Sequence, residues 1–357
     1  MDGTTAASPA PGSGRLGGRW SALGPTGGAI IALVVLVAVN AVLTPNFATA
    51  GNFWNVLFQL AVTLLVAVGM TLVIATGGID LSVGSLMAVS GAVSMEFLAA
   101  AGDSTSIGVA LAAVGLSLLI TGILGAVNGV LVAYVGLQPF IATLVLMLAG
   151  RGVAKVITGG QNTAASSDPF RWIANGFVIG IPVVFILAVL IVVLVAWVVR
   201  RSALGLMIEA IGINPKASRM AGIKPKGLLL TAYVLSGILA GIAGVMSVGS
   251  VMTVDISRTG YQLELDAILA VVIGGASLAG GKFSLSGAFV GALLIATLDK
   301  TVLYLGVSSS ATPAFKAIVI VAICLLQSDR VRSWFQRRKK TVAPAPRVEI
   351  VKEEAAA

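Results

Sequence analysis

Histidine is absent from the sequence, and cysteine occurs once among its 357 residues. Without histidine, the chain can form neither a His-ligated metal site nor a histidine-dependent catalytic triad. Its single cysteine, Cys324, lies inside an apolar run and has no second thiol in the chain to pair with. These absences exclude internal disulfides and two common kinds of enzyme active site.

Charged residues are scarce as well. They make up 10% of the chain, against 57% hydrophobic residues, and the mean hydropathy is +1.03. Soluble domains carry roughly 25% charged residues, so this chain has too little polar surface to cover a globule in water. Its 43 glycines include G-x-x-x-G pairs beginning at Gly125, Gly237 and Gly287, which are typical of helices that pack closely in lipid. The composition predicts an all-α, polytopic transmembrane helical bundle without a soluble domain.

Apolar runs long enough to cross a bilayer recur along the chain. A hydrocarbon core of about 30 Å needs about 20 helical residues. Glycine-rich breaks near 77–78, 136–139 and 280–281 are either surface turns or interruptions inside the membrane. On the length criterion we predict about ten spans, at 27–43, 56–76, 81–100, 107–135, 140–157, 177–199, 227–249, 265–280, 284–305 and 313–327.

The lysines and arginines indicate how the spans are oriented. With ten spans and a cytoplasmic N-terminus, the outer loops hold only Arg171 and Arg258, as the positive-inside rule requires. The net charge of +9 therefore reflects topology and not nucleic-acid binding, which would interleave basic and aromatic residues on a soluble domain. We predict a membrane domain, 27–330, between a flexible tail, 1–26, and a basic, then disordered tail, 331–357. Both tails are expected to be cytoplasmic.

The cytoplasmic loop 200–226 carries helix signals of its own. Asn214 can cap a helix, Pro215 suits its first position, and Gly222 suits the position after its end. The small residues between them would leave a flat surface able to enter a cleft on a soluble partner. The other interpretation is a solvated basic loop held at the phospholipid headgroups.

The residues of this loop resemble the coupling-helix motif of sugar-type ABC importer permeases, which in that family docks on the ATP-binding subunit. Segments 74–84 and 263–275 resemble ribose-type permeases, while 138–144 and 149–152 look closest to galactofuranose permeases. The resemblance covers about 27–330. The residues assigned to coupling on this basis are Glu209, Ala210, Gly212, Asn214, Pro215, Ala217, Arg219, Ala221, Gly222 and Ile223.

The resemblance implies a permease subunit of a monosaccharide ABC importer in a bacterial inner membrane. It implies three kinds of partner: a cytoplasmic ATPase that binds ATP and Mg²⁺, an extracytoplasmic sugar-binding protein, and a second permease copy or a sister permease. This chain would itself bind no cofactor and would not be an enzyme. Its nearest match to a phosphate loop has Ala276 in place of the first glycine and Phe283 in place of the Mg²⁺-binding hydroxyl.

An ion-coupled secondary transporter of small polar solutes is the alternative function. It would need cation-coordinating carboxylates near the middle of the membrane and would have no need of a docking loop. Few acidic residues fall within the predicted spans, and the loop 200–226 has the composition of a docking element. A membrane-embedded enzyme is disfavoured because no catalytic cluster is evident.

Polar residues and glycines in or beside the spans are candidates for the translocation path or its gate. Asp80 and Arg151 could line the path, or could form an ion pair that only fixes helix packing. The pattern G-G-x-x-L-x-x-G at 77–84 and 274–281 suits two repeated halves interrupted at corresponding places, although the abundance of Gly and Leu leaves coincidence open. The candidates are Gly77, Gly78, Asp80, Ser82, Asn128, Arg151, Gly274 and Gly275.

Overall fold

The computed structural model describes residues 24–308 and 311–327. The first helix begins at Gly24, within the last residues of the tail predicted at 1–26. The rest of that tail, and the whole of the predicted tail 331–357, lie outside the described residues.

Helices account for most of the described chain, and its strands are only two residues long. In chain order the helices are α2 (Gly24–Leu43), α3 (Ala50–Ala75), α4 (Val83–Ala101), α5 (Ile107–Val130), η1 (Leu131–Val135), α6 (Pro139–Ile157), α7 (Asp168–Asn175), α8 (Val183–Arg201), α9 (Leu204–Ile213), α10 (Pro215–Met220), α11 (Pro225–Val251), α12 (Leu263–Ile273), α13 (Leu285–Tyr304) and α14 (Thr312–Gln327). The strands are β1 (Thr163–Ala164), β2 (Phe177–Val178), β3 (Ile181–Pro182) and β4 (Thr253–Val254). Strand β1 pairs antiparallel with β4, and β2 with β3. The predicted all-α membrane bundle is confirmed.

Eight helices in the described part of the chain are long and apolar enough to cross a membrane. Two of the ten predicted spans are therefore shorter than expected. The span predicted at 265–280 is α12, whose 11 residues reach only about 16 Å. It ends early because Gly275 adopts a left-handed φ of 96°, a conformation that stops a helix. The span predicted at 313–327 is α14, with 16 residues.

The sixth predicted span also begins later than expected. Residues 177–182 form the β2–β3 hairpin, with Gly180 at a φ of 76° in its turn. Helix α8 starts only at Val183. The apolar residues of the hairpin were indistinguishable from a helical run by hydropathy alone.

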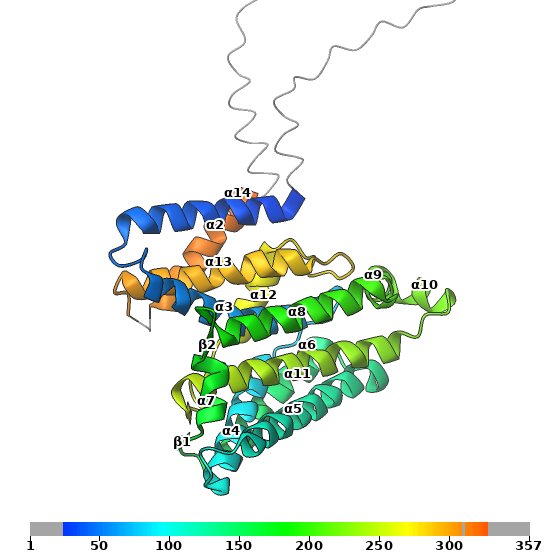
Figure 1. Ribbon diagram of the computed structural model, residues 1–357. Coiled ribbons are helices and arrows are strands. Elements are labelled where there is room, and N and C mark those ends of the chain that lie inside the picture. Colours follow the sequence, from blue (N-terminus) through cyan, green and yellow to red (C-terminus); the bar gives the residue numbers. More distant parts are fainter. Residues whose placement is uncertain (1–23, 309–310, 328–357) are drawn as a thin grey trace, which may run out of the picture.

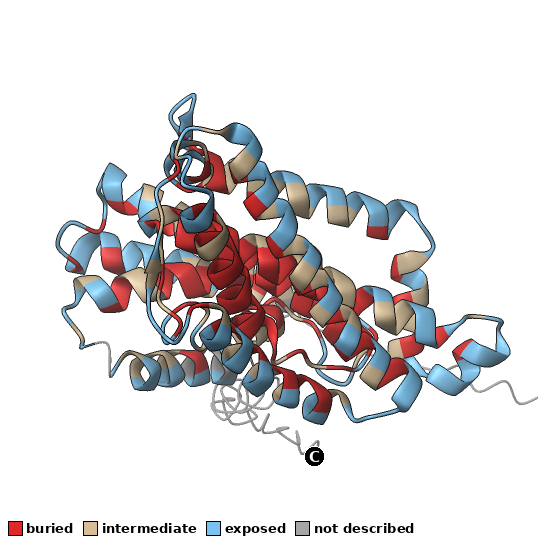
Figure 2. Cartoon of the chain, turned by 90° about the horizontal axis from the view of Figure 1, so that it is seen from below, coloured by how far each residue is buried: buried red, intermediate tan, exposed pale blue. Residues whose placement is uncertain are grey.

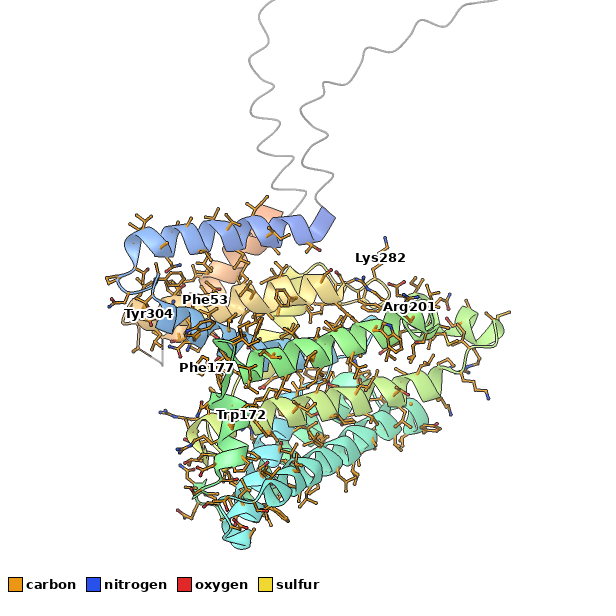
Figure 3. All side chains as sticks on the ribbon, viewed as in Figure 1. Phe53, Trp172, Phe177, Arg201, Lys282 and Tyr304 are labelled. Carbon is orange, nitrogen blue, oxygen red and sulfur yellow. The ribbon has the colours of Figure 1, made fainter. Side chains whose placement is uncertain are left out.

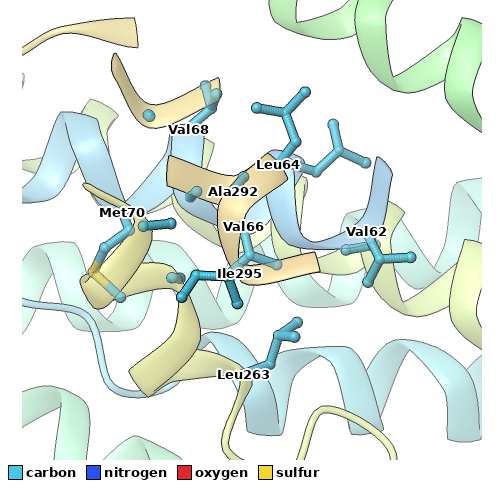
Figure 4. Close-up of a cluster of buried hydrophobic side chains, with 14 of the residues drawn as sticks. Val62, Leu64, Val66, Val68, Met70, Leu263, Ala292 and Ile295 are labelled. Atoms are coloured by element: carbon cyan, nitrogen blue, oxygen red, sulfur yellow. The ribbon is translucent and has the colours of Figure 1, made fainter. Parts of the chain in front are cut away.

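Helix α3 forms the centre of the bundle. All of its residues from 60 to 75 are buried, because a helix that is apolar on every side can be covered on every side. Val66 of α3 lies in a cluster with Leu263 of α12 and Ile295 of α13 (Figure 4). Figure 2 shows these buried residues as a core surrounded by helices whose outer faces are exposed. Those exposed faces are apolar, as expected for surfaces that meet lipid.

Glycines bring the remaining long helices together. A Cβ built on Gly237 of α11 would lie 3.0 Å from the Cα of Gly125 of α5, and one on Gly129 would lie 3.0 Å from the Cα of Leu230. A Cβ on Gly291 of α13 would collide with the carbonyl oxygen of Ala270 of α12. The close packing predicted from the G-x-x-x-G pairs is confirmed.

The two ends of the bundle differ in side-chain chemistry. Phe53, Trp172, Phe177 and Tyr304 lie at one end, here called the aromatic end, which also carries α7 and the β2–β3 hairpin (Figures 1 and 3). The opposite end, called the basic end, carries Arg201, Lys282 and the helices α9 and α10. This separation is the one expected when aromatic residues mark an interface and basic residues mark the cytoplasmic side. The short helix α7 and both hairpin strands were not predicted.

Candidate functional site

Helix α10 is built from the cap residues that predicted it. Asn214 precedes the helix, and its side-chain oxygen accepts hydrogen bonds from the backbone N–H groups of Lys216 and Ala217, both at 3.0 Å. At the other end, Gly222 has a φ of 85°, and the N–H of Ile223 donates to the carbonyl of Ser218 at 3.0 Å. The helix predicted between Asn214 and Gly222 is confirmed.

Helix α9 was not predicted, although it carries the first part of the coupling motif. Glu209, Ala210 and Gly212 lie on this helix and not on α10. Its inner side is anchored by Ile208 and Ile211, which are 2% and 1% exposed. The signal that could have found it is the spacing of these apolar residues, in a run of ten that is too short to span a membrane.

The outer sides of α9 and α10 are exposed. Met220 at the end of α10 is 90% exposed and Ile213 is 73% exposed, beside the exposed basic side chains of Lys216 and Arg219. Ribbon views place α10 at the tip of the basic end, beyond the other helices (Figure 1). The arrangement offers a mixed apolar and basic surface to a soluble partner. Of the predicted coupling residues, the exposed ones are Asn214, Pro215, Ala217, Arg219, Ala221 and Gly222.

Gly212 faces the opposite way, into the bundle. A Cβ on it would collide with the carbonyl oxygen of Ala75, at the end of α3, and with the backbone nitrogen of Gly281. The inner side of α9 therefore touches backbone at the ends of two other segments, and Gly212 is not part of the exposed surface of α10.

Asp80 is the centre of a buried hydrogen-bond network in the break between α3 and α4. Its Oδ1 accepts from the backbone N–H and the hydroxyl of Ser82, at 3.0 and 2.6 Å. Its Oδ2 accepts from the hydroxyl of Ser236 on α11 at 2.7 Å. Asn128 of α5 donates to the Ser82 hydroxyl at 2.9 Å. All four residues are at most 1% exposed, so this cluster fixes the break against α5 and α11.

Arg151 belongs to a different network. Its Nη1 donates to the carbonyls of Ile256, at 3.0 Å, and Thr259, at 2.6 Å. These carbonyls lie in the segment 255–262, which joins the aromatic end of α11 to α12. Arg151 lies about 18 Å along α6 from its first residue, and it anchors the buried residues Ile256 and Thr259, whereas Ser257 and Arg258 between them are exposed. The ion pair with Asp80 that was one of two interpretations is not found among the described residues.

The segment 255–262 also meets the first turn of α4. A Cβ on Gly84 would collide with the carbonyl oxygen of Gly260 and with the side chain of Glu264. Gly260 itself has a φ of 66°. Non-helical backbone at membrane depth is tolerated only when buried in protein or lining an aqueous cavity, which makes this segment a candidate wall of the translocation path that the sequence did not reveal.

The two glycine-rich breaks share a helix ending, with one change of register. Gly77 has a φ of 84° and Gly275 a φ of 96°. Each donates to the carbonyl three residues earlier, at 2.8 and 2.9 Å. The geometry thus aligns Gly77 with Gly275, whereas the sequence pattern aligned it with Gly274. The left-handed residue is the first glycine of the pair at 77–78 and the second glycine of the pair at 274–275.

A second charged cluster was missed. The Nζ of Lys316 on α14 lies 2.9 Å from a carboxylate oxygen of Asp266 on α12 and 2.5 Å from one of Asp299 on α13. One lysine therefore ties three helices together. Opposite charges on separate predicted spans are the signal that could have found it.

Comparisons with known proteins identify the family to which this chain is similar. Residues 52–326 match the family described as branched-chain amino acid transport system / permease component. The chain is 49% identical to a fructose import permease protein of Bifidobacterium longum (strain NCC 2705), across 87% of this chain and 90% of the relative. It is 42% identical to a galactofuranose transporter permease protein of Escherichia coli (strain K12), across 87% of this chain and 91% of the relative. It is 43% identical to a ribose import permease protein of the same strain, across 84% of this chain and 93% of the relative. No solved structure matches.

Overall identity is higher with the fructose relative than with the galactofuranose relative, so the sequence does not single out galactofuranose. The matches cover nearly all of the described residues and agree with the permease interpretation, not with an ion-coupled transporter. Such permeases are not enzymes themselves. The chain belongs to the permease components of ABC importers.

Proposed function

We propose that this chain forms the membrane path for a monosaccharide in a bacterial ABC importer. The observation that carries the proposal is the exposed, capped helix α10, on a chain similar along most of its length to import permeases for fructose, galactofuranose and ribose. The helix lies at one end of the bundle, the basic end (Figure 1), which suits a path driven from one side.

The ATP-binding partner docks on α9 and α10. Exposed apolar side chains surrounded by basic ones, such as Met220 beside Arg219, suit an apolar cleft with an acidic rim, since interface cores are apolar and rims polar. ATP and Mg²⁺ are bound by that partner. The basic end then faces the cytoplasm, with both termini on that side, in the inner membrane.

The sugar-binding protein docks at the aromatic end. There α7 packs on α11 through the buried Phe170 and Ala174, beside the β2–β3 hairpin (Figure 1), and Ile179 in the hairpin turn is 96% exposed. The sugar then meets the segment 255–262, which Arg151 anchors. A second permease, identical or a sister chain, completes the path, because polar side chains of the long helices, such as Ser90, Ser117 and Asn128, are buried between this chain's own helices.

ATP-driven uptake tests the proposal. Vesicles would contain this chain, an ATPase with a phosphate loop and a sugar-binding protein encoded beside it, with labelled fructose, ribose and galactofuranose as separate probes. The expected result is uptake of at least one sugar that needs ATP and both partners. Uptake that proceeds without the ATPase and follows an ion gradient would contradict the proposal.

A further inference from the structure

Three segments meet at the basic end of the bundle with backbone packed directly against backbone at Gly212 and Gly280. The first is α9 at Gly212, the second is the end of α3 at Ala75, and the third is the turn after α12 at Gly280 and Gly281. The N–H of Gly281 donates to the carbonyl of Ala75 at 2.9 Å. We call this contact of Gly212, Ala75, Gly77, Gly280 and Gly281 the glycine junction.

The junction has no space for a larger residue at Gly212 or Gly280. A Cβ on Gly212 would collide with the Ala75 carbonyl and lie 2.9 Å from the Cα of Gly281. One on Gly280 would lie 2.9 Å from the carbonyl oxygen of Gly212 and 3.0 Å from the Cα and N of Gly77. These neighbours are backbone atoms, which cannot rotate away as a flexible side chain could. The three segments are therefore in rigid contact.

Each segment of the junction leads to a different part of the molecule. Helix α9 leads directly to α10, the proposed docking helix. The end of α3 leads through Gly77 to the break that Asp80 fixes against α5 and α11. The turn at Gly280 and Gly281 follows α12, whose other end continues from the segment that Arg151 holds. A displacement of α9 must therefore displace both the break at Asp80 and helix α12, because packed interiors transmit strain.

We propose that Gly212 is a positioning residue that transmits movement of the docked helices to the translocation path, and is not a contact to the ATP-binding partner. The proposal rests on the proposed function, and it divides the coupling motif in two. The exposed residues of α10 bind the partner, while Gly212 conveys the resulting movement to α3 and α12. A purely structural role for Gly212 would instead lower the stability of the whole bundle and leave transport per folded molecule unchanged.

The test compares G212A with G227A in the complex with the ATPase. Gly227 lies near the start of α11 at the same end of the molecule, but a Cβ there would meet nothing within 4 Å. For G212A we expect the ATPase to co-purify normally and basal ATP hydrolysis to persist, while uptake per complex falls at least about tenfold, since forced overpacking displaces backbone. G227A should transport as the unmodified protein does. G280A enters the same contact from the other side and adds the strain of alanine at a φ of 89°, so it should lower uptake at least as far as G212A does.

A second readout does not depend on which sugar is carried. Ser257 is exposed in the segment 255–262, which follows the aromatic end of α11, the end that the proposed function places outside. S257C in a C324S background can therefore report labelling by a membrane-impermeant maleimide with and without ATP. We expect ATP to change the labelling rate in the unmodified and G227A complexes but not in G212A. If G212A responds to ATP as the unmodified complex does, the transmission role is wrong while the docking of the ATPase stands. If the unmodified chain does not retain the ATPase, the proposed function fails, and the junction loses the movement it would transmit.

Discussion

The exposed helix α10 and the buried hydrogen-bond networks of Asp80 and Arg151 are positioned by opposite means. Asn214 and Gly222 shape α10 through hydrogen bonds within nine residues of chain. Asp80 and Arg151 instead bond to residues 156 and 108 positions away. One region is therefore held by local backbone chemistry, and the other by contacts that exist only when the bundle is assembled.

The difference teaches where the chain can tolerate change. Surface residues of a helix can be replaced with little effect on stability, so α10 is free to specialise in binding a partner. A buried carboxylate or guanidinium must keep its partners, because an unpaired charge in the membrane costs several kcal/mol. Substitutions in the buried breaks should act on the fold, and those on α10 should act on assembly.

The largest effect is expected for D80L. Leucine is larger than aspartate and accepts no hydrogen bonds, so the hydroxyls of Ser82 and Ser236 lose their buried acceptor. We expect a loss of stability of about 3 kcal/mol, measured by thermal unfolding in detergent. D80N keeps one side-chain acceptor and should lose less stability than D80L. Unchanged unfolding of D80L would show that the break is held by packing alone.

R151A should have the next largest effect. It removes the donor to the carbonyls of Ile256 and Thr259, and we expect about 2 kcal/mol of destabilisation, concentrated in the segment 255–262. The matched control is K155A, since Lys155 lies one turn further along α6 and is exposed. Labelling of S257C should become faster in R151A and stay the same in K155A. Equal labelling rates in both variants would show that Arg151 does not hold the segment 255–262 in place.

M220D should separate assembly from folding. Met220 is 90% exposed, so its replacement should change stability by less than about 0.5 kcal/mol. An aspartate in an apolar cleft would weaken binding of the ATPase by about tenfold, measured by titration of the purified partner. The comparison is L206D, because Leu206 is equally accessible, at 74% exposed, but lies on the other docking helix, α9. If L206D weakens binding more than M220D, the docking surface is centred on α9.

The same local-versus-distant division explains what could be predicted from the sequence. Apolar runs predicted the positions of the eight long helices, because hydropathy reports a property of each segment. They could not separate α12 from a full span, since its end depends on the left-handed conformation of Gly275. Likewise, the hairpin at 177–182 was taken for helix because its residues are as apolar as those of α8.

For the candidate site, the capped helix α10 was predictable and the networks were not. The partners of Arg151 are backbone carbonyls, which no residue type identifies in advance. The junction at Gly212 likewise depends on Ala75 and Gly281, whose proximity is a consequence of how α9 folds back on the bundle. Only the polar or glycine character of these residues, and not their contacts, could be recognised in the sequence.

The smallest effect is expected for N214A, which tests whether local chemistry alone holds α10. Alanine cannot accept the hydrogen bonds from Lys216 and Ala217, and loss of such a cap costs about 1 kcal/mol. Because α10 has only six residues, this loss should fray the helix itself while the membrane helices keep their unfolding temperature. Hydrogen exchange of the amides in 215–220 should accelerate, and ATPase binding should weaken less than in M220D. N214D restores the acceptor and should restore both. If the amides in 215–220 of N214A remain protected from hydrogen exchange, α10 is held by its packing against α9 and α11. Helix α10 and the buried networks of Asp80 and Arg151 would then both depend on tertiary contacts.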